Sequence, residues 1–143
     1  MTDVPEIHKL VNFFAARDEM LPKSLIAIYE NLRDFYVAQK NSEILGCCAL
    51  HICWEDLAEI KSLAVGEDAQ GIGLGRKLVQ SCIDESKEIG IPRLFALTYV
   101  PEFFIKMGFH SIENASLPHK IWSECIYCPK FPNCGEKAVE LCL

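Results

Sequence analysis

The sequence lacks the features that would place the chain in a membrane, on a secretory route or on nucleic acid. It has no run of about 18 apolar residues, so no segment is expected to span a membrane. Residues 1–6 contain neither a basic region nor an apolar core, and they do not form a signal peptide. Positive charge is also scarce, since the net charge is −6, which disfavours a nucleic-acid partner. These absences lead us to expect a cytoplasmic protein.

What is present fits one folded domain. The chain has 143 residues, and half of them are apolar, which is enough to form a core without disulfides or metals. It shows no internal repeat, linker or low-complexity segment. We therefore expect a single domain over residues 1–143, with a cysteine-containing C-terminal segment at 117–143. The oligomeric state is not fixed by the sequence, and a homodimer is one candidate.

Hydrophobic periodicity predicts the order of the elements. Helical spacing covers residues 4–16, and a second helix follows with Ser24 as its N-cap. Period-two patterns then predict three strands, followed by a glycine-rich loop and a helix that ends at Gly90. A short strand, a short helix and a last strand at 109–113 complete the pattern, and the tail from residue 117 has no clean period. This order predicts an α/β domain with a mixed sheet.

One predicted strand, residues 57–65, carries charged residues in an apolar setting. Strict alternation along this strand places Glu59, Lys61, Leu63 and Val65 on one face. Two residues of a strand span about 6.6 Å, so the Lys61 ammonium can hold a carboxylate while Glu59 faces a nearby amine.

The most distinctive motif is glycine-rich and reads Gln70-Gly71-Ile72-Gly73-Leu74-Gly75, followed by Arg76 and Lys77. It lies between an apolar strand pattern and an amphipathic helix pattern. Glycines let several backbone N–H groups point into one concavity, and a helix N-terminus favours an anion there. The motif therefore predicts a phosphate-binding loop; a tight glycine turn without a ligand is the alternative.

Two common phosphate loops do not fit this motif. A P-loop needs a Lys-Ser/Thr pair after its last glycine, and a dinucleotide-binding fingerprint needs G-x-G-x-x-G. The pattern Q/R-x-x-G-x-G/A of acetyl-CoA pyrophosphate loops, in contrast, is matched by Gln70, Gly73 and Gly75.

Two flanking segments extend this match. Glu59-Ile60-Lys61-Ser62-Leu63-Ala64-Val65 precedes the loop at the right distance, and Phe103-Phe104-Ile105-Lys106-Met107-Gly108-Phe109 is similar to the helix-end signature YEKLGF. Together the three segments resemble the GNAT N-acetyltransferases over roughly residues 35–113. The resemblance implies a GNAT fold, in which helices flank a mixed, mostly antiparallel sheet, and it implies acetyl-CoA as co-substrate.

The resemblance also assigns residues to the donor. The backbone of Leu63, Ala64 and Val65 would bond the pantetheine arm as an added strand does, and an N–H in this stretch would polarise the thioester carbonyl. The pyrophosphate would lie on the loop, whose donor-binding residues would be Gln70, Gly71, Ile72, Gly73, Leu74, Gly75, Arg76 and Lys77.

Acetyl transfer needs a base for the attacking ammonium and an acid for the leaving thiolate. Glu59 stands where several GNAT enzymes carry a glutamate base; a salt bridge at the sheet edge is its alternative role. The tyrosine that many relatives use as the acid is replaced here by Phe104, so Tyr99 is the substitute candidate. Departure of the thiolate as an anion, or through water, is the alternative.

Further segments resemble the short, single-domain N-acetylglutamate synthases of bacterial arginine biosynthesis. These segments are residues 20–24, 28–35, 54–65, 95–99 and the tail from 117, so the match spans nearly the whole chain. This resemblance implies that acetyl is transferred to the α-amine of L-glutamate. The alternatives are an acetyltransferase for another small amine, or a non-catalytic acyl-CoA-binding module.

An acceptor with two carboxylates needs two cations or donor clusters. Lys61 lies on the strand of Glu59, and Lys23 and Arg33 fall in the region that shapes the acceptor side of this fold. We therefore expect Lys23, Arg33 and Lys61 to bind the substrate, with a solvated surface position as the alternative for each.

The cysteine tail is one ligand short of a zinc site. Cys125, Cys128 and Cys134 have part of the spacing, and His119 or Cys142 could supply the fourth ligand. Reduced, packed thiols are the main expectation, so no metal is assigned. A structural zinc and a redox pair are the alternatives.

Overall fold

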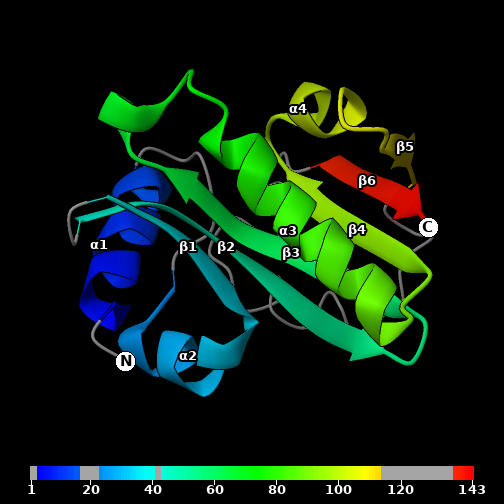
Figure 1. Ribbon diagram of the computed structural model, residues 1–143, viewed down its shortest axis with the longest axis horizontal. Helices are drawn as coiled ribbons and strands as arrows, with labels where there is room; N and C mark the ends of the chain where they lie inside the picture. The colour runs from blue at the N-terminus through cyan, green and yellow to red at the C-terminus, as the bar shows by residue number, and fades with distance from the viewer. Residues whose placement is uncertain (1–2, 17–22, 41–42, 114–136) are drawn as a thin grey trace.

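The computed structural model describes residues 3–16, 23–40, 43–113 and 137–143 (Figure 1). Up to β5 its elements follow the predicted order, which confirms the α/β class. They are α1 (Val4–Ala15), α2 (Leu25–Glu30), the 3-10 turn η1 (Leu32–Asp34), β1 (Phe35–Lys40), β2 (Glu43–Trp54), β3 (Leu57–Val65), the 3-10 turn η2 (Glu67–Ala69), α3 (Leu74–Ile89), β4 (Arg93–Thr98), α4 (Pro101–Ile105), β5 (His110–Ile112) and β6 (Lys137–Cys142).

The strands form one six-stranded sheet in the order β1-β2-β3-β4-β6-β5. β3 and β4 are parallel, and all other neighbouring pairs are antiparallel. The mixed, mostly antiparallel sheet inferred from the sequence is therefore confirmed.

Strand β6 was not predicted. It pairs with β4 along its whole length, and β5 joins its other edge. Local patterning misses it because Ala138, Val139 and Glu140 are all buried, so apolar and polar residues do not alternate. Glu140 is accommodated by an ion pair with Arg93 on β4, and this partner raises the Arg93 pKa.

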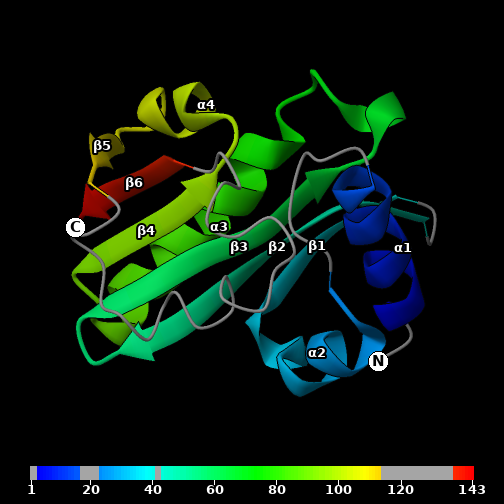
Figure 2. The same cartoon turned by 180° about the vertical axis from the view of Figure 1, so that it is seen from behind.

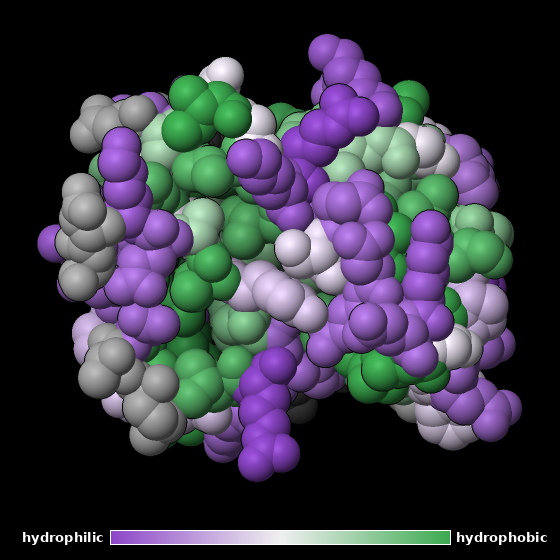
Figure 3. Space-filling model, viewed as in Figure 1, coloured by the Kyte–Doolittle hydropathy of each residue, from purple (hydrophilic) through white to green (hydrophobic). Residues whose placement is uncertain are grey.

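Helices cover both faces of the sheet (Figures 1 and 2). α3 packs on one face, where Leu78, Val79, Cys82 and Ile83 join the largest apolar cluster. α1 and α2 lie on the opposite face, beside β1, β2 and β3. The outer side of α3 carries hydrophilic side chains, as its amphipathic pattern requires (Figure 3).

A β-bulge in β3 changes which side chains share a face. Cys47 pairs with Ala64 and Ala49 pairs with Lys61, so two residues of β3 lie opposite Cys48 alone, and Ser62 takes a φ of 56°. The expected alternation is therefore wrong beyond Lys61. Glu59 and Lys61 lie on the face of α1 and α2, whereas Leu63 and Val65 pack against the α3 cluster on the other face.

Candidate active site

Strands β3 and β4 separate in the middle of the sheet. Their parallel ladder runs from Leu57↔Arg93 to Glu59↔Phe95, and in the described part of the chain no later residue pair joins them. Among the described strands, β4 beyond this point is paired with β6 alone. The backbone of β3 from residue 60 onward therefore has an edge to which an extended ligand can hydrogen-bond, as an added strand would. Leu63, Ala64 and Val65 lie on this stretch.

The glycine-rich loop joins this strand end to α3. Gly71 and Gly73 have φ values of 86° and 83°, a conformation that favours glycine, and a side chain added at either position would meet no described atom within 4 Å. The loop between Gln70 and α3 is thus open on its outer side, where Ile72 is also exposed. Gly73 is the N-cap of α3, so the first N–H groups of the helix point into this opening.

The charged side chains at the start of α3 would stabilise a bound anion. A helix N-terminus is stabilised by acidic residues, yet the first turn of α3 has none. It carries Arg76 and Lys77 instead, and both side chains are exposed. A Cβ added at Gly75 would lie 3.4 Å from the ring of Phe103, so α3 approaches α4 closely there, and Leu74 is half-buried beside it.

The Gln70 side chain stabilises the start of the glycine-rich loop. Its side-chain Nε2 donates a hydrogen bond to the Val65 carbonyl at 2.9 Å. The side chain expected at the pyrophosphate is therefore turned back to the end of β3, where it fixes the entry of the loop. The backbone N–H of Val65 is unaffected by this bond.

Glu59 lies at the point where the parallel ladder ends. It pairs with His51 of β2 on one side and with the fully buried Phe95 of β4 on the other. Its side chain is half-buried, on the face of α1 and α2. The expected base is thus placed at the apex of the separation between β3 and β4.

The structure brings two of the three expected cations together. Lys23 and Lys61 line the same narrow crevice between α2 and the sheet, with Asn31, Asp34 and Ser62. Lys23 is held there by Asn12 of α1, whose side-chain amide accepts from the Lys23 N–H at 3.2 Å and donates to the Lys23 carbonyl at 2.7 Å.

The N-cap of α2 also fixes the position of Lys23. The Ser24 hydroxyl accepts the Ala27 N–H at 3.1 Å, which confirms the predicted cap and starts the helix directly after Lys23. The backbone of Lys23 is therefore fixed by Asn12 on one side and by the start of α2 on the other.

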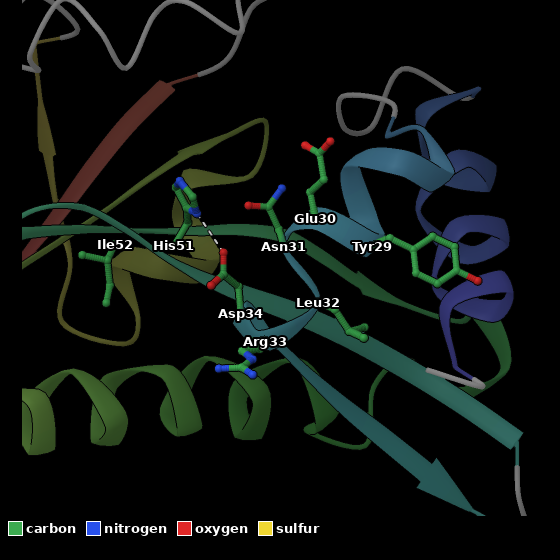
Figure 4. Close-up of a pocket in the computed structure, with 8 residues that line it drawn as sticks. All are labelled: Tyr29, Glu30, Asn31, Leu32, Arg33, Asp34, His51 and Ile52. Atoms are coloured by element: carbon green, nitrogen blue, oxygen red, sulfur yellow. Dashed lines mark hydrogen bonds and ion pairs between the residues drawn. The ribbon is translucent and has the colours of Figure 1, made fainter.

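Arg33 is separated from these two lysines. It lines the adjoining pocket of about 460 Å³, and in Figure 4 its guanidinium points away from Asp34 and His51. The crevice and the pocket share Asn31 and Asp34, so they form neighbouring parts of one concave region.

A histidine–carboxylate pair in this pocket was not predicted from the sequence. His51 Nδ1 lies 2.7 Å from Asp34 Oδ2 (Figure 4). The two residues are 17 positions apart, on β2 and η1, so no local motif connects them. The only sequence signal was a histidine within an apolar strand pattern.

The candidates for the acid differ in burial. Phe104 is 3% exposed and packs edge-to-face with Phe103 and Phe109, so this position belongs to the core. Tyr99 follows β4 directly, and its hydroxyl oxygen is buried.

The described cysteines are free thiols. Burial raises the pKa of Cys47 to about 12, and a hydrogen bond with Cys82 together with burial raises the pKa of Cys48, so neither thiol ionises readily to a nucleophile. Cys125, Cys128 and Cys134 lie outside the described residues. Within the residues that are described, no three His, Cys, Asp or Glu side chains are grouped to hold a metal. The helices described there also include none with the length and apolar character needed to cross a membrane.

Comparisons with known proteins agree with this geometry. A profile of the acetyltransferase (GNAT) family matches residues 3–109. An uncharacterized N-acetyltransferase of Chlorobaculum tepidum is 38% identical over 97% of this chain and 90% of its own length. The amino-acid acetyltransferase of Mycobacterium tuberculosis is 34% identical over 86% of this chain and 72% of its own.

A solved structure is similar over the whole chain. It is the N-acetylglutamate synthase of Neisseria gonorrhoeae in complex with coenzyme A and N-acetyl-glutamate. The TM-score is 0.90 with 27% identity, and the match covers 100% of this chain and 33% of that one. Since the family profile covers well over half of the sequence, and since the relatives share its fold, the chain belongs to the GNAT acetyltransferase family and is a GNAT N-acetyltransferase.

Proposed function

We propose that the protein transfers acetyl from acetyl-CoA to the α-amine of L-glutamate. The observation that carries this proposal is the crevice lined by both Lys23 and Lys61, on the sheet face of Glu59. Two ammonium groups complement the two carboxylates of glutamate, and charge-assisted hydrogen bonds of this kind are among the strong ones in proteins.

The donor would occupy the other half of the site. The pantetheine arm would bond the edge of β3 at Leu63, Ala64 and Val65, and the pyrophosphate would lie on the open glycine loop at the N-terminus of α3. Arg76 and Lys77 add charge beside it. The N–H groups near Leu63 would polarise the thioester carbonyl.

Direct transfer accounts for the placement of Glu59. Its carboxylate takes one proton from the glutamate ammonium, and the neutral amine attacks the thioester carbon. The C–N bond forms and the C–S bond breaks. The second proton leaves the nitrogen and reaches the thiolate through water, or it reprotonates the Tyr99 hydroxyl after that hydroxyl has given its proton to the thiolate. The proton on Glu59 passes to solvent. The net products are N-acetylglutamate, CoA thiol and one proton.

Relatives support this acceptor class. The Mycobacterium protein is named an amino-acid acetyltransferase, and the Neisseria structure holds coenzyme A together with N-acetyl-glutamate. The Neisseria chain is about three times longer than the matched part, and the molecules that it holds are a guide to this site.

The test is acetyl-CoA consumption with glutamate, glutamine and aspartate side by side. The thioester absorbance should be followed, because thiol-detecting dyes also react with the eight cysteines of the chain. We expect turnover with glutamate and much less with glutamine, which lacks the second carboxylate. Equal turnover with glutamine, or turnover with an unrelated amine alone, would contradict the proposal.

A further inference from the structure

The His51–Asp34 pair has a defined proton arrangement. An ionised carboxylate only accepts hydrogen bonds, so at 2.7 Å from Asp34 Oδ2 the His51 Nδ1 is the donor. In a neutral imidazole the other nitrogen, Nε2, is then a proton acceptor. The pair therefore presents an acceptor nitrogen whose tautomer is fixed by its partner.

This imidazole lies next to the base proposed for catalysis. His51 of β2 is directly opposite Glu59 of β3 in the antiparallel ladder, and both belong to the sheet face of α1 and α2. Side chains paired in this way have Cβ atoms about 5 Å apart. A proton on Glu59 is thus within reach of His51 directly or through one water molecule.

The surroundings connect the pair to solvent. The side chains of His51 and Asp34 are 39% and 26% exposed, and both line the pocket of about 460 Å³. On its other side Glu59 is paired with the fully buried Phe95. A proton that passes from Glu59 to His51 can leave through this pocket.

Other charged groups around the imidazole come from three elements. They are Glu30 of α2, Arg33 of η1, and Lys61 beside Glu59 on β3. Figure 4 shows Arg33 directed away from the pair and the Glu30 carboxylate pointing away from it as well. Asp34 contacts the imidazole directly.

We infer that Asp34 and His51 form a proton relay that returns Glu59 to its carboxylate form in each catalytic cycle. This inference rests on the proposed role of Glu59. The proton that Glu59 takes from the ammonium passes to His51 Nε2, which becomes an imidazolium stabilised by Asp34. The imidazolium then releases a proton to solvent, so no proton accumulates in the site. His51 and Asp34 act through Glu59 and are positioning residues for it.

The first experiment removes the imidazole and replaces it from solution. We expect His51→Ala to lower kcat by about 10- to 100-fold with little change in either KM. Added imidazoles should restore part of the rate, and the restored rate should rise with their basicity. His110→Ala is the matched control, since His110 also faces a carboxylate, Glu140, but lies on β5. It should retain the wild-type rate and show no response to imidazole.

The second experiment asks whether His51 acts through Glu59. In a Glu59→Gln background, His51→Ala should cost almost nothing further, because the relay has no proton to carry. Asp34→Asn, which keeps an oxygen near Nδ1, should lower kcat less than His51→Ala and should shift the pH profile. Additive losses, an unaltered kcat in His51→Ala, or a loss that no imidazole restores would overturn the relay.

The assays use whichever amine the wild type acetylates. If that amine is not glutamate, the proposed acceptor is wrong, and the same variants still decide the relay. If glutamate is acetylated and the variants behave additively, the acceptor stands and the relay is wrong.

Discussion

The donor side and the acceptor side of this site are built from different parts of the chain. The donor side consists of backbone: the edge of β3, the glycine loop and the N-terminus of α3. The proposed acceptor side consists of side chains, chiefly those of Lys23 and Lys61, which come from separate segments and line one crevice. On the proposed function, the backbone of the fold would bind the donor, while a few side chains would select the acceptor.

Glu59 stands between the two sides, and its loss should have the largest effect. We expect Glu59→Gln to lower kcat by about 10²- to 10⁴-fold, with KM values for both substrates little changed. Steady-state kinetics over both substrates is the measurement. Glu88→Gln, on the exposed side of α3, is the matched control and should behave as wild type. A rate within about twofold of wild type in Glu59→Gln would remove the base assignment.

The acceptor side should respond to loss of either lysine. Lys61→Met or Lys23→Met should raise the KM for glutamate by about 10- to 100-fold, because a hydrogen bond to a charged group contributes about 1.5–3 kcal/mol. The KM for acetyl-CoA should not change. Lys87→Met, exposed on the outer side of α3, is the control. An equal rise in both KM values would contradict the assignment of the two lysines to the acceptor side.

The donor side should respond to a change of backbone conformation. Gly73→Ala should destabilise the loop by about 1–2 kcal/mol, the cost of a left-handed conformation for a residue with a Cβ. If that cost appears in donor binding, the KM for acetyl-CoA rises about tenfold, since about 1.4 kcal/mol is a factor of ten. Gly66→Ala, at a φ of −54°, is the control and should bind as wild type. An unchanged donor KM together with an unchanged free energy of unfolding in Gly73→Ala would contradict the left-handed conformation at Gly73, and an unchanged donor KM with a loss of stability would mean that the loop does not hold the pyrophosphate.

Substitutions at the bulge should change the stability of the fold. Ser62 has a φ of 56°, so Ser62→Gly should relieve strain and raise the free energy of unfolding by up to about 1 kcal/mol, while Ser62→Val should lower it. Denaturant unfolding measures both variants. Lower stability in Ser62→Gly would show that the Ser62 side chain contributes more than its backbone costs.

The sequence indicates the proposed donor side more directly than the proposed acceptor side for a physical reason. The glycine loop and the start of α3 are contiguous, so their spacing alone indicates an anion site. Lys61 and Glu59 could be related because they share one strand. Lys23 was proposed from a resemblance. Its hydrogen bonding to Asn12 could not be predicted from sequence spacing.

Three features escaped prediction because they depend on pairing across the sheet. The bulge at Ser62 follows from register with β2, so the shared face assumed for Glu59 and Val65 failed. The Asp34–His51 contact joins residues that only the fold brings together. The middle residues of β6 are all buried and include Glu140. The strand therefore shows no alternation of apolar and polar residues.

The bulge in β3 also bears on how such a protein can diverge. Because it turns the side chains of residues 59 and 61 to one face and those of 63 and 65 to the other, mutations can accumulate at one pair without disturbing the other. On the proposed function, a lineage can therefore change position 61 for a new amine while Glu59 and the backbone that would bind the donor are kept. One additional residue in a strand would in this way separate a substrate-selecting side chain from the core packing of the same strand.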